Sequence, residues 1–127
     1  MLAGQRILVV EDEVLIAFDL RDCFQEAGAR SVRLAHTLSE ALPLAKRAQI
    51  SSAVLDIRLG TDGVAPVAEA LAARGIPFLF YTGQSKDDPV RLAYPGILAL
   101  AKPTDAWVLA KALSGLRAHQ QAPQAAG

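Results

Sequence analysis

Residues 51–60 read SSAVLDIRLG, an apolar run typical of a buried β-strand that nevertheless carries an aspartate, Asp56, near its end. A carboxylate in an apolar setting is costly because desolvation disfavours its charged form, so Asp56 needs water or a cation beside it. Four more short apolar runs predict strands of the same kind: RILVV at 6–10, SVRLA at 31–35, PFLFYT at 77–82 and ILALA at 97–101. Nearly continuous apolar strands are typical of a parallel sheet that is covered on both faces.

Longer amphipathic stretches separate these strands and predict helices. The expected ranges are 14–27, 38–47, 64–74, 90–93 and 104–118. Thr37 or Ser39 could cap the second helix, in which Pro43 falls early enough to be tolerated. The fourth helix is expected to be short or poorly ordered, because prolines and glycines interrupt residues 84–96.

Strands that alternate with helices indicate βαβ units with right-handed crossovers. We therefore expect an α/β fold: a doubly wound (βα)5 domain over residues 1–118, with a five-stranded parallel sheet in the order 2-1-3-4-5. Residues 119–127, HQQAPQAAG, have little to bury and are expected to form a disordered tail. In such sheets ligands bind outside the carboxyl ends of the strands, so function is expected where strands end.

Composition and charge exclude several classes of function. Thirteen basic residues balance thirteen acidic ones, so no overall field attracts nucleic acid or an anionic membrane surface. The sequence has neither a signal-peptide pattern nor an apolar stretch of about 20 residues that could span a membrane. Its single cysteine, Cys23, cannot form an internal disulfide and fits a reducing cytosol, although we interpret it as a plain buried thiol. We expect a soluble cytoplasmic domain.

Polar residues follow four of the predicted strands: Glu11, Asp12, Asp56, Thr82 and Lys102. Because the carboxyl ends of parallel strands share one edge of a sheet, these side chains can meet in one cleft. Three carboxylates that meet in one cleft would repel one another unless a cation lay among them. Oxygen ligands favour a hard divalent ion such as Mg²⁺ over zinc, for which the sequence holds no His/Cys set.

A metal ion, an ammonium and a hydroxyl around one carboxylate describe a site that can accept a phosphoryl group, so the sequence predicts phosphorylation of Asp56. Each residue also has an ordinary interpretation. Asp12 could cap the next helix, Asp56 and Thr82 could be turn residues, and Lys102 could be a surface charge. The functional interpretation is favoured because four independently predicted strands each bring the required residue type to the same edge.

The motifs VVEDE, AVLDIRLG, FYTG and LAKP occur in this order and together resemble the response-regulator receiver domain of two-component signalling. The resemblance covers about residues 6–118 and implies the strand order of flavodoxin-like and CheY-like proteins. It implies that Asp56 is the phosphoacceptor and that Glu11 and Asp12 hold Mg²⁺, with the backbone carbonyl of Arg58 completing the metal site.

By the same resemblance, Thr82 would hydrogen-bond the phosphoryl group and Lys102 would pair with it, next to a cis Lys102–Pro103 peptide bond. The phosphodonor would be a phosphohistidine on a sensor histidine kinase or a histidine phosphotransferase. Such a domain catalyses its own phosphotransfer and dephosphorylation and acts on no metabolite. Its output would be protein binding or a place in a phosphorelay.

Some details resemble one receiver subgroup, and others depart from the family pattern. GIPFLFYTGQ resembles the often stand-alone receivers with a Phe-Ala-Thr-Gly motif, with Tyr81 in place of Ala. Where most receivers carry a switching aromatic, three residues before the lysine, this chain has Ala99, so ordering of residues 84–96 is our hypothesis for the switch. The loop after Asp56 has Gly60 instead of the usual proline and is about a residue short.

Other functions remain as alternatives. A phosphorylation-independent pseudo-receiver would keep the fold as a protein-binding module, which the intact acids, Thr82 and Lys102 argue against. A nucleotide-dependent enzyme would need a phosphate-binding glycine motif, and a phosphohydrolase a second aspartate where Arg58 stands. A flavin domain would need a hydroxyl- and glycine-rich loop after the first strand instead of EDE. Trp107 could belong to a partner surface, but we favour its packing against the sheet.

Overall fold

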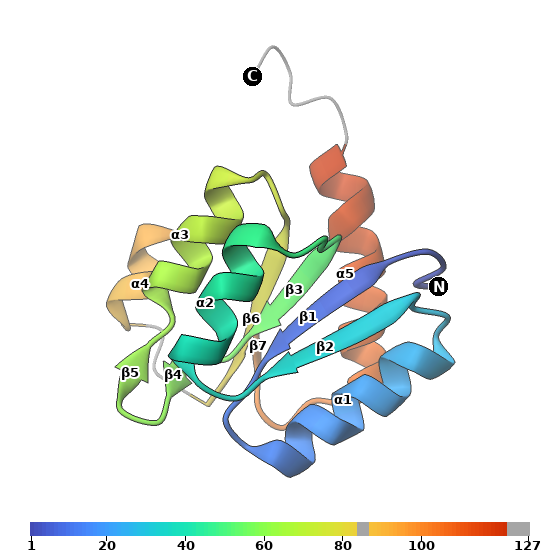
Figure 1. The fold of residues 1–127 in the computed structure, drawn as a ribbon, viewed down its shortest axis with the longest axis horizontal. Helices are drawn as coiled ribbons and strands as arrows, with labels where there is room; N and C mark the ends of the chain where they lie inside the picture. Colours follow the sequence, from blue (N-terminus) through green and yellow to red (C-terminus); the bar gives the residue numbers. More distant parts are fainter. Residues whose placement is uncertain (84–86, 122–127) are drawn as a thin grey trace.

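The computed structural model describes residues 1–83 and 87–121 and contains a five-stranded parallel sheet between two layers of helices (Figure 1). In chain order the elements are β1 (Arg6–Val10), α1 (Val14–Glu26), β2 (Ser31–Ala35), α2 (Leu38–Arg47), β3 (Ser52–Leu55), β4 (Arg58–Leu59), β5 (Asp62–Gly63), α3 (Ala65–Ala73), β6 (Phe78–Thr82), α4 (Pro89–Ala93), β7 (Ala99–Ala101) and α5 (Ala106–Gln121). The main sheet has the order β2-β1-β3-β6-β7, and all of its pairings are parallel. This confirms the predicted order, since β6 and β7 are its fourth and fifth strands along the chain.

Each face of the sheet carries its own hydrophobic core. Leu8, Leu55 and Phe80 are buried on the face that α2 and α3 cover. Val9 and Leu79 are buried on the opposite face, against α1 and α5. Successive residues of a strand point to opposite faces, so burial of both sets explains why these strands read as uninterrupted apolar runs.

On the first face, α2 begins at Leu38 as the sequence predicts, and α3 begins at Ala65, one residue after its predicted start. The hydroxyl of Thr37 caps α2 by accepting a hydrogen bond from the backbone N–H of Glu40, at 3.1 Å. Pro43 lies inside α2, as expected. The fourth helix, α4, is confirmed as short, with five residues. The start of the segment expected to be poorly ordered, residues 84–86, lies outside the described residues.

The loop between β3 and α3 contains a feature that the sequence did not predict. β4 and β5 form a small antiparallel hairpin just beyond the end of β3. Gly60 lies at its turn with φ +66°, in the left-handed region that glycine adopts without steric cost. Strands of two residues carry no periodic pattern, so only the turn residues of this loop were recognisable in advance.

The last helix corrects one prediction and extends another. Trp107, favoured above to pack against the sheet, is 44% exposed on α5, and the buried core of that face is completed by Leu109 and Leu113. α5 reaches Gln121, three residues past the expected end of the helix at 118, and residues 122–127 lie outside the described part. Cys23 is confirmed as a buried free thiol. In the part of the chain that the structure describes, no helix has the length and apolar character needed to cross a membrane.

Candidate phosphoacceptor site

The polar residues that follow the strands gather at one edge of the sheet. Glu11 and Asp12 directly follow β1, and Asp56 follows β3, which pairs with β1. The backbone N–H of Asp56 donates to the carbonyl of Val10 at 2.9 Å, which holds the two strand ends side by side. The prediction that strand topology brings these three carboxylates together therefore agrees with the geometry: ligand oxygens of all three lie within 4.8 Å of one another.

Lys102 links two of these carboxylates. Its ammonium nitrogen lies 2.7 Å from Oε1 of Glu11 and 3.0 Å from Oδ2 of Asp56, and its side chain is largely buried. Lys102 reaches them from the end of β7, where its backbone N–H donates to the carbonyl of Thr82 at 3.1 Å. The interpretations of Lys102 as a surface charge and of Asp56 as a turn residue are therefore wrong for this structure, because both side chains belong to a buried ionic cluster.

Glu11 is the most buried acid of the cluster, only 2% exposed. Burial raises its pKa from 4.5 to about 7, against the hydrogen bonds from Lys102 and from the backbone of Glu13 that favour the carboxylate. For Lys102, burial acts to lower the pKa, but the hydrogen bonds to Glu11 and Asp56 outweigh it and the net pKa is raised. Lys102 is therefore a fixed positive charge, and Glu11 is the group that can hold a proton near neutral pH.

Asp12 is exposed. Its Oδ2 accepts a hydrogen bond from the backbone N–H of Gly60 at 3.1 Å. The N-cap of α1 is Glu13, which makes no side-chain capping bond, so the interpretation of Asp12 as a helix cap is wrong. Asp12 instead ties the end of β1 to the β4–β5 hairpin and keeps a carboxylate open to solvent.

A pocket of about 280 Å³ opens over this cluster, lined by Asp12, Glu13, Asp56, Arg58, Gly60, Gly83 and Lys102. Its donor set fits a hard divalent cation, because carboxylate oxygens from two strand ends converge there and one of them is exposed. Arg58 lines the pocket, while ligation by its backbone carbonyl stays a prediction. Thr82 is buried at the end of β6, next to Gly83, and its bond to a phosphoryl group also stays a prediction.

Three contacts near the site were not predicted from the sequence. His36 places Nδ1 2.9 Å from the carbonyl oxygen of Glu11, so its ring supports the chain where β1 ends. The bond from Gly60 to Asp12 was also missed, although a glycine in a turn-rich loop was a signal. The third is the hydroxyl of Tyr81, which donates to the carbonyl of Thr104 and accepts from its N–H, both at 3.0 Å.

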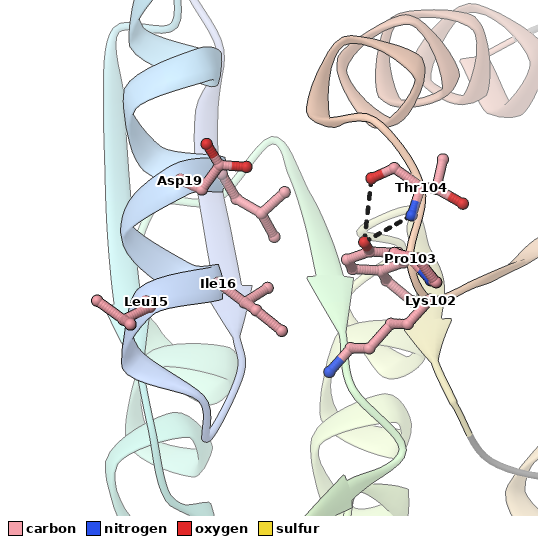
Figure 2. A pocket seen from close by; sticks show the side chains of 8 residues that line it. Leu15, Ile16, Asp19, Lys102, Pro103 and Thr104 are labelled. Atoms are coloured by element: carbon pink, nitrogen blue, oxygen red, sulfur yellow. Dashed lines mark hydrogen bonds between the residues drawn. The ribbon is translucent and has the colours of Figure 1, made fainter.

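A second cavity, of about 310 Å³, lies beside the site between α1 and the turn that follows β7 (Figure 2). Leu15, Ile16 and Asp19 of α1 stand on one side of it, and Lys102 and Pro103 on the other. The peptide bond between Lys102 and Pro103 is cis, as the sequence motif predicted.

Comparison with known proteins gives a consistent result. A family model described as the response regulator receiver domain matches residues 7–114 of the chain. Among curated proteins, the phyllosphere-induced regulator PhyR of Methylorubrum extorquens is 32% identical over 109 residues. That match covers 83% of this chain but only 37% of PhyR, so the chain spans well under half of that regulator.

Solved structures share the fold over nearly the whole chain. A CheY-like receiver protein from Methanospirillum hungatei superposes with a TM-score of 0.82 at 21% identity, covering 93% of this chain and 97% of its own. A receiver protein from Sinorhizobium medicae gives a TM-score of 0.79 at 23% identity, covering 95% and 100%. A response regulator from Burkholderia pseudomallei, solved with a phosphorylated aspartic acid, a calcium ion and citrate, gives 0.72 at 26% identity, covering 97% and 74%.

Proposed function

The chain belongs to the response regulator receiver domain family, and we propose that it is a signalling switch that accepts a phosphoryl group on Asp56 in a reaction that needs Mg²⁺. The observation that carries the proposal is the pairing of Asp56 with Lys102 at 3.0 Å, beside the exposed carboxylate of Asp12. Receiver domains are signalling modules, so we assign no metabolite as substrate. The transfer to Asp56 and the later hydrolysis of the acyl phosphate are the reactions that we propose.

In the proposed transfer, a carboxylate oxygen of Asp56 attacks phosphorus while the bond from phosphorus to the donor's imidazole nitrogen breaks. The nitrogen keeps the electron pair, and Asp56 becomes an acyl phosphate. Lys102 supplies positive charge at the oxygens of the transferring group, and the hydroxyl of Thr82 donates a hydrogen bond to one of them. Mg²⁺ bound by Glu11, Asp12, Asp56 and the carbonyl of Arg58 would supply further positive charge there.

Two observations support the role of Asp56. It is the only described aspartate among the buried polar residues, at 6% exposed, and it opens onto the pocket that Asp12 and Lys102 also line. A response regulator 26% identical to this chain holds a phosphorylated aspartic acid together with a calcium ion, which is also a hard cation with oxygen ligands. We take the corresponding chemistry in this chain to be phosphorylation of Asp56 beside a divalent ion.

The phosphodonor that we propose is a phosphohistidine on a sensor histidine kinase or a histidine phosphotransferase in the cytoplasm. For output we propose binding of a protein partner or transfer of the phosphoryl group along a relay. Four large apolar side chains on α4, α5 and the approach to β7 are exposed and available for such contacts: Leu92, Leu98, Trp107 and Val108. Ordering of residues 84–96 on phosphorylation remains our hypothesis for the switch, because Ala99 supplies no aromatic ring.

Intact mass after incubation with Mg²⁺ and acetyl phosphate tests the proposal. We expect a gain of one phosphoryl group that is lost in Asp56→Asn and on addition of a chelator. Asp62→Asn is the matched control, since Asp62 is an exposed aspartate in the neighbouring hairpin and should leave the gain unchanged. A wild-type protein that gains no mass and binds no Mg²⁺ would instead indicate the phosphorylation-independent pseudo-receiver.

A further inference from the structure

From the contacts of Tyr81 we infer that this residue is a positioning residue for Lys102, holding the turn from which the lysine reaches the phosphoacceptor. The inference rests on the proposed function, because it assigns a role within the same phosphotransfer. The hydroxyl of Tyr81 donates to the carbonyl of Thr104 and accepts from the N–H of Thr104, both at 3.0 Å. Figure 2 draws these two bonds as dashed lines that run from one hydroxyl oxygen to the carbonyl oxygen and the backbone nitrogen of Thr104.

The hydrogen bonds of the sheet do not extend along the whole turn after β7. The N–H of Lys102 donates to the carbonyl of Thr82, which is the last bond in register with the sheet. Pro103 has no N–H to donate. The backbone of Thr104 then bonds to Tyr81, so one side chain continues the attachment of the turn to β6 beyond the point where the strand ladder stops.

Packing does not replace this attachment. The cavity of about 310 Å³ between α1 and the turn borders Lys102, Pro103 and Thr104, so this side of the turn faces open space instead of a filled core (Figure 2). Tyr81 also lines this cavity, but it is only 5% exposed and belongs to the core beneath α1 and α5. A buried ring therefore anchors a turn that borders open space, in which the hydroxyl of Thr104 also donates to the carbonyl of Ala101 at 2.6 Å.

The same ring also lies beside the lysine. The ammonium nitrogen of Lys102 is 5.7 Å from the ring centroid of Tyr81, within the range of a cation–π contact. The lysine then ends 2.7 Å from Glu11 and 3.0 Å from Asp56. The ammonium end of the lysine thus lies beside the ring of the tyrosine whose hydroxyl holds the turn.

The hydroxyl is the part of Tyr81 that core packing does not explain. A phenylalanine would fill the same apolar space, whereas a buried hydroxyl is costly unless it is hydrogen-bonded. Here it has a donor and an acceptor on a single residue, two positions after the active-site lysine. Because a misplacement of about 1 Å can slow a reaction by as much as 100-fold, a small loosening of this turn should be visible in the rate.

The experiment compares wild type with Tyr81→Phe, which removes the hydroxyl and keeps the ring. Phosphorylation by acetyl phosphate is followed by intact mass, and the first-order rate constant is measured at saturating donor and Mg²⁺. We expect it to fall about 3- to 10-fold, the size expected for loss of a hydrogen bond expressed in the transition state. The half-saturating concentrations of donor and Mg²⁺ should not change, because the residues that bind the metal stay in place.

Tyr94→Phe is the matched control, since it removes the same atom from the other of the chain's two tyrosines. The ring of Tyr94 packs against Phe78, on the opposite face of the sheet from Tyr81. The rate constant of phosphorylation of Tyr94→Phe should equal that of wild type. If Tyr81 only stabilised the fold, Tyr81→Phe would lower the fraction of folded, reactive protein, but the folded molecules would be phosphorylated with the wild-type rate constant.

The outcomes separate this inference from the proposed function. If wild type gains no phosphoryl group, the proposed function fails. If wild type is phosphorylated and Tyr81→Phe reacts at the same rate, or Tyr94→Phe is slowed equally, the positioning role is overturned. Rates are compared at a temperature where circular dichroism shows every variant folded, with trimethylamine N-oxide added if Tyr81→Phe needs it, so that a stability loss cannot imitate either result.

Discussion

The burial of Glu11 leads to a prediction about stability and pH. Its pKa rises from 4.5 to about 7 on folding, mainly because burial disfavours the carboxylate. Between these two pH values the folded protein keeps a proton that the unfolded chain has lost. The contribution of Glu11 to stability is therefore most favourable below about pH 4.5, declines as the pH rises and levels off above about pH 7.

The magnitude follows from the same numbers. At 1.36 kcal/mol per pH unit, the interval between 4.5 and about 7 corresponds to about 3 kcal/mol lost from the free energy of unfolding. Glu11→Gln removes the titrating group and keeps the shape of the side chain. Without metal, the stability of wild type relative to Glu11→Gln should therefore fall by about 3 kcal/mol from acid to weakly alkaline pH.

Urea unfolding in the presence of a chelator, at about pH 4.5 and about pH 8, measures this difference because the midpoint shift and the slope give the free energy at each pH. Titrating groups that do not interact with Glu11 are common to both proteins and cancel in the comparison. Glu13→Gln is the control, since it removes an exposed carboxylate two residues away. If wild type and Glu11→Gln differ by the same amount at both pH values, burial of Glu11 does not control the charge state of this site.

Further predictions concern the metal, a helix end and the thiol. In urea unfolding, Mg²⁺ at 100 times its dissociation constant should raise the unfolding free energy of wild type by about 2.7 kcal/mol and that of Asp12→Asn by much less. Equal increases in both proteins would show that Asp12 is not a metal ligand. Arg74 donates to the carbonyls of Ala45 and Ala48 at the end of α2, at 2.8 and 2.7 Å, so Arg74→Ala should lower the unfolding free energy by about 1–2 kcal/mol. A thermal unfolding midpoint equal to that of wild type would contradict this. Burial and nearby acids raise the pKa of the Cys23 thiol, so the thiol should react only slowly with a disulfide reagent until urea unfolds the chain. Fast labelling of the folded protein would contradict the burial of Cys23.

Strand topology could be predicted because it depends on features that a sequence displays directly. β1 and β2 begin and end at the predicted residues, since their apolar runs are bounded by charged or turn-forming residues. The meeting of Glu11, Asp12 and Asp56 then follows from strand order alone. No knowledge of side-chain geometry was needed, because parallel strands bring their carboxyl ends to one edge.

The remaining features depend on contacts between segments that the sequence does not pair. Asp12 could have capped a helix, and only the position of Gly60, 48 residues away, decides that it bonds to the hairpin instead. Trp107 lies beside the apolar stripe that Leu109 and Leu113 form along the sequence, and only the packed helix decides that these leucines are buried while Trp107 is 44% exposed. The bond between Tyr81 and Thr104 joins β6 to the turn that follows β7, and neither residue has a local signal for it.

The charges in the site explain why the proposed reaction uses both a metal and a lysine. Three carboxylates and one ammonium leave two net negative charges when Glu11 is ionised. Phosphorylation would replace the single negative charge of Asp56 by that of an acyl phosphate, about −1.5 to −2 at neutral pH, and so increase the excess. In a buried setting such an excess is strongly unfavourable unless opposite charge is present. A proton on Glu11 can lower the excess in the absence of metal, but it also blocks a ligand atom. The burial that raises the pKa of Glu11 therefore makes a divalent cation a better partner for this carboxylate than a proton once a phosphoryl group arrives. Lys102 is already paired with Asp56, so its positive charge can stay beside the phosphoryl oxygens after the donor leaves.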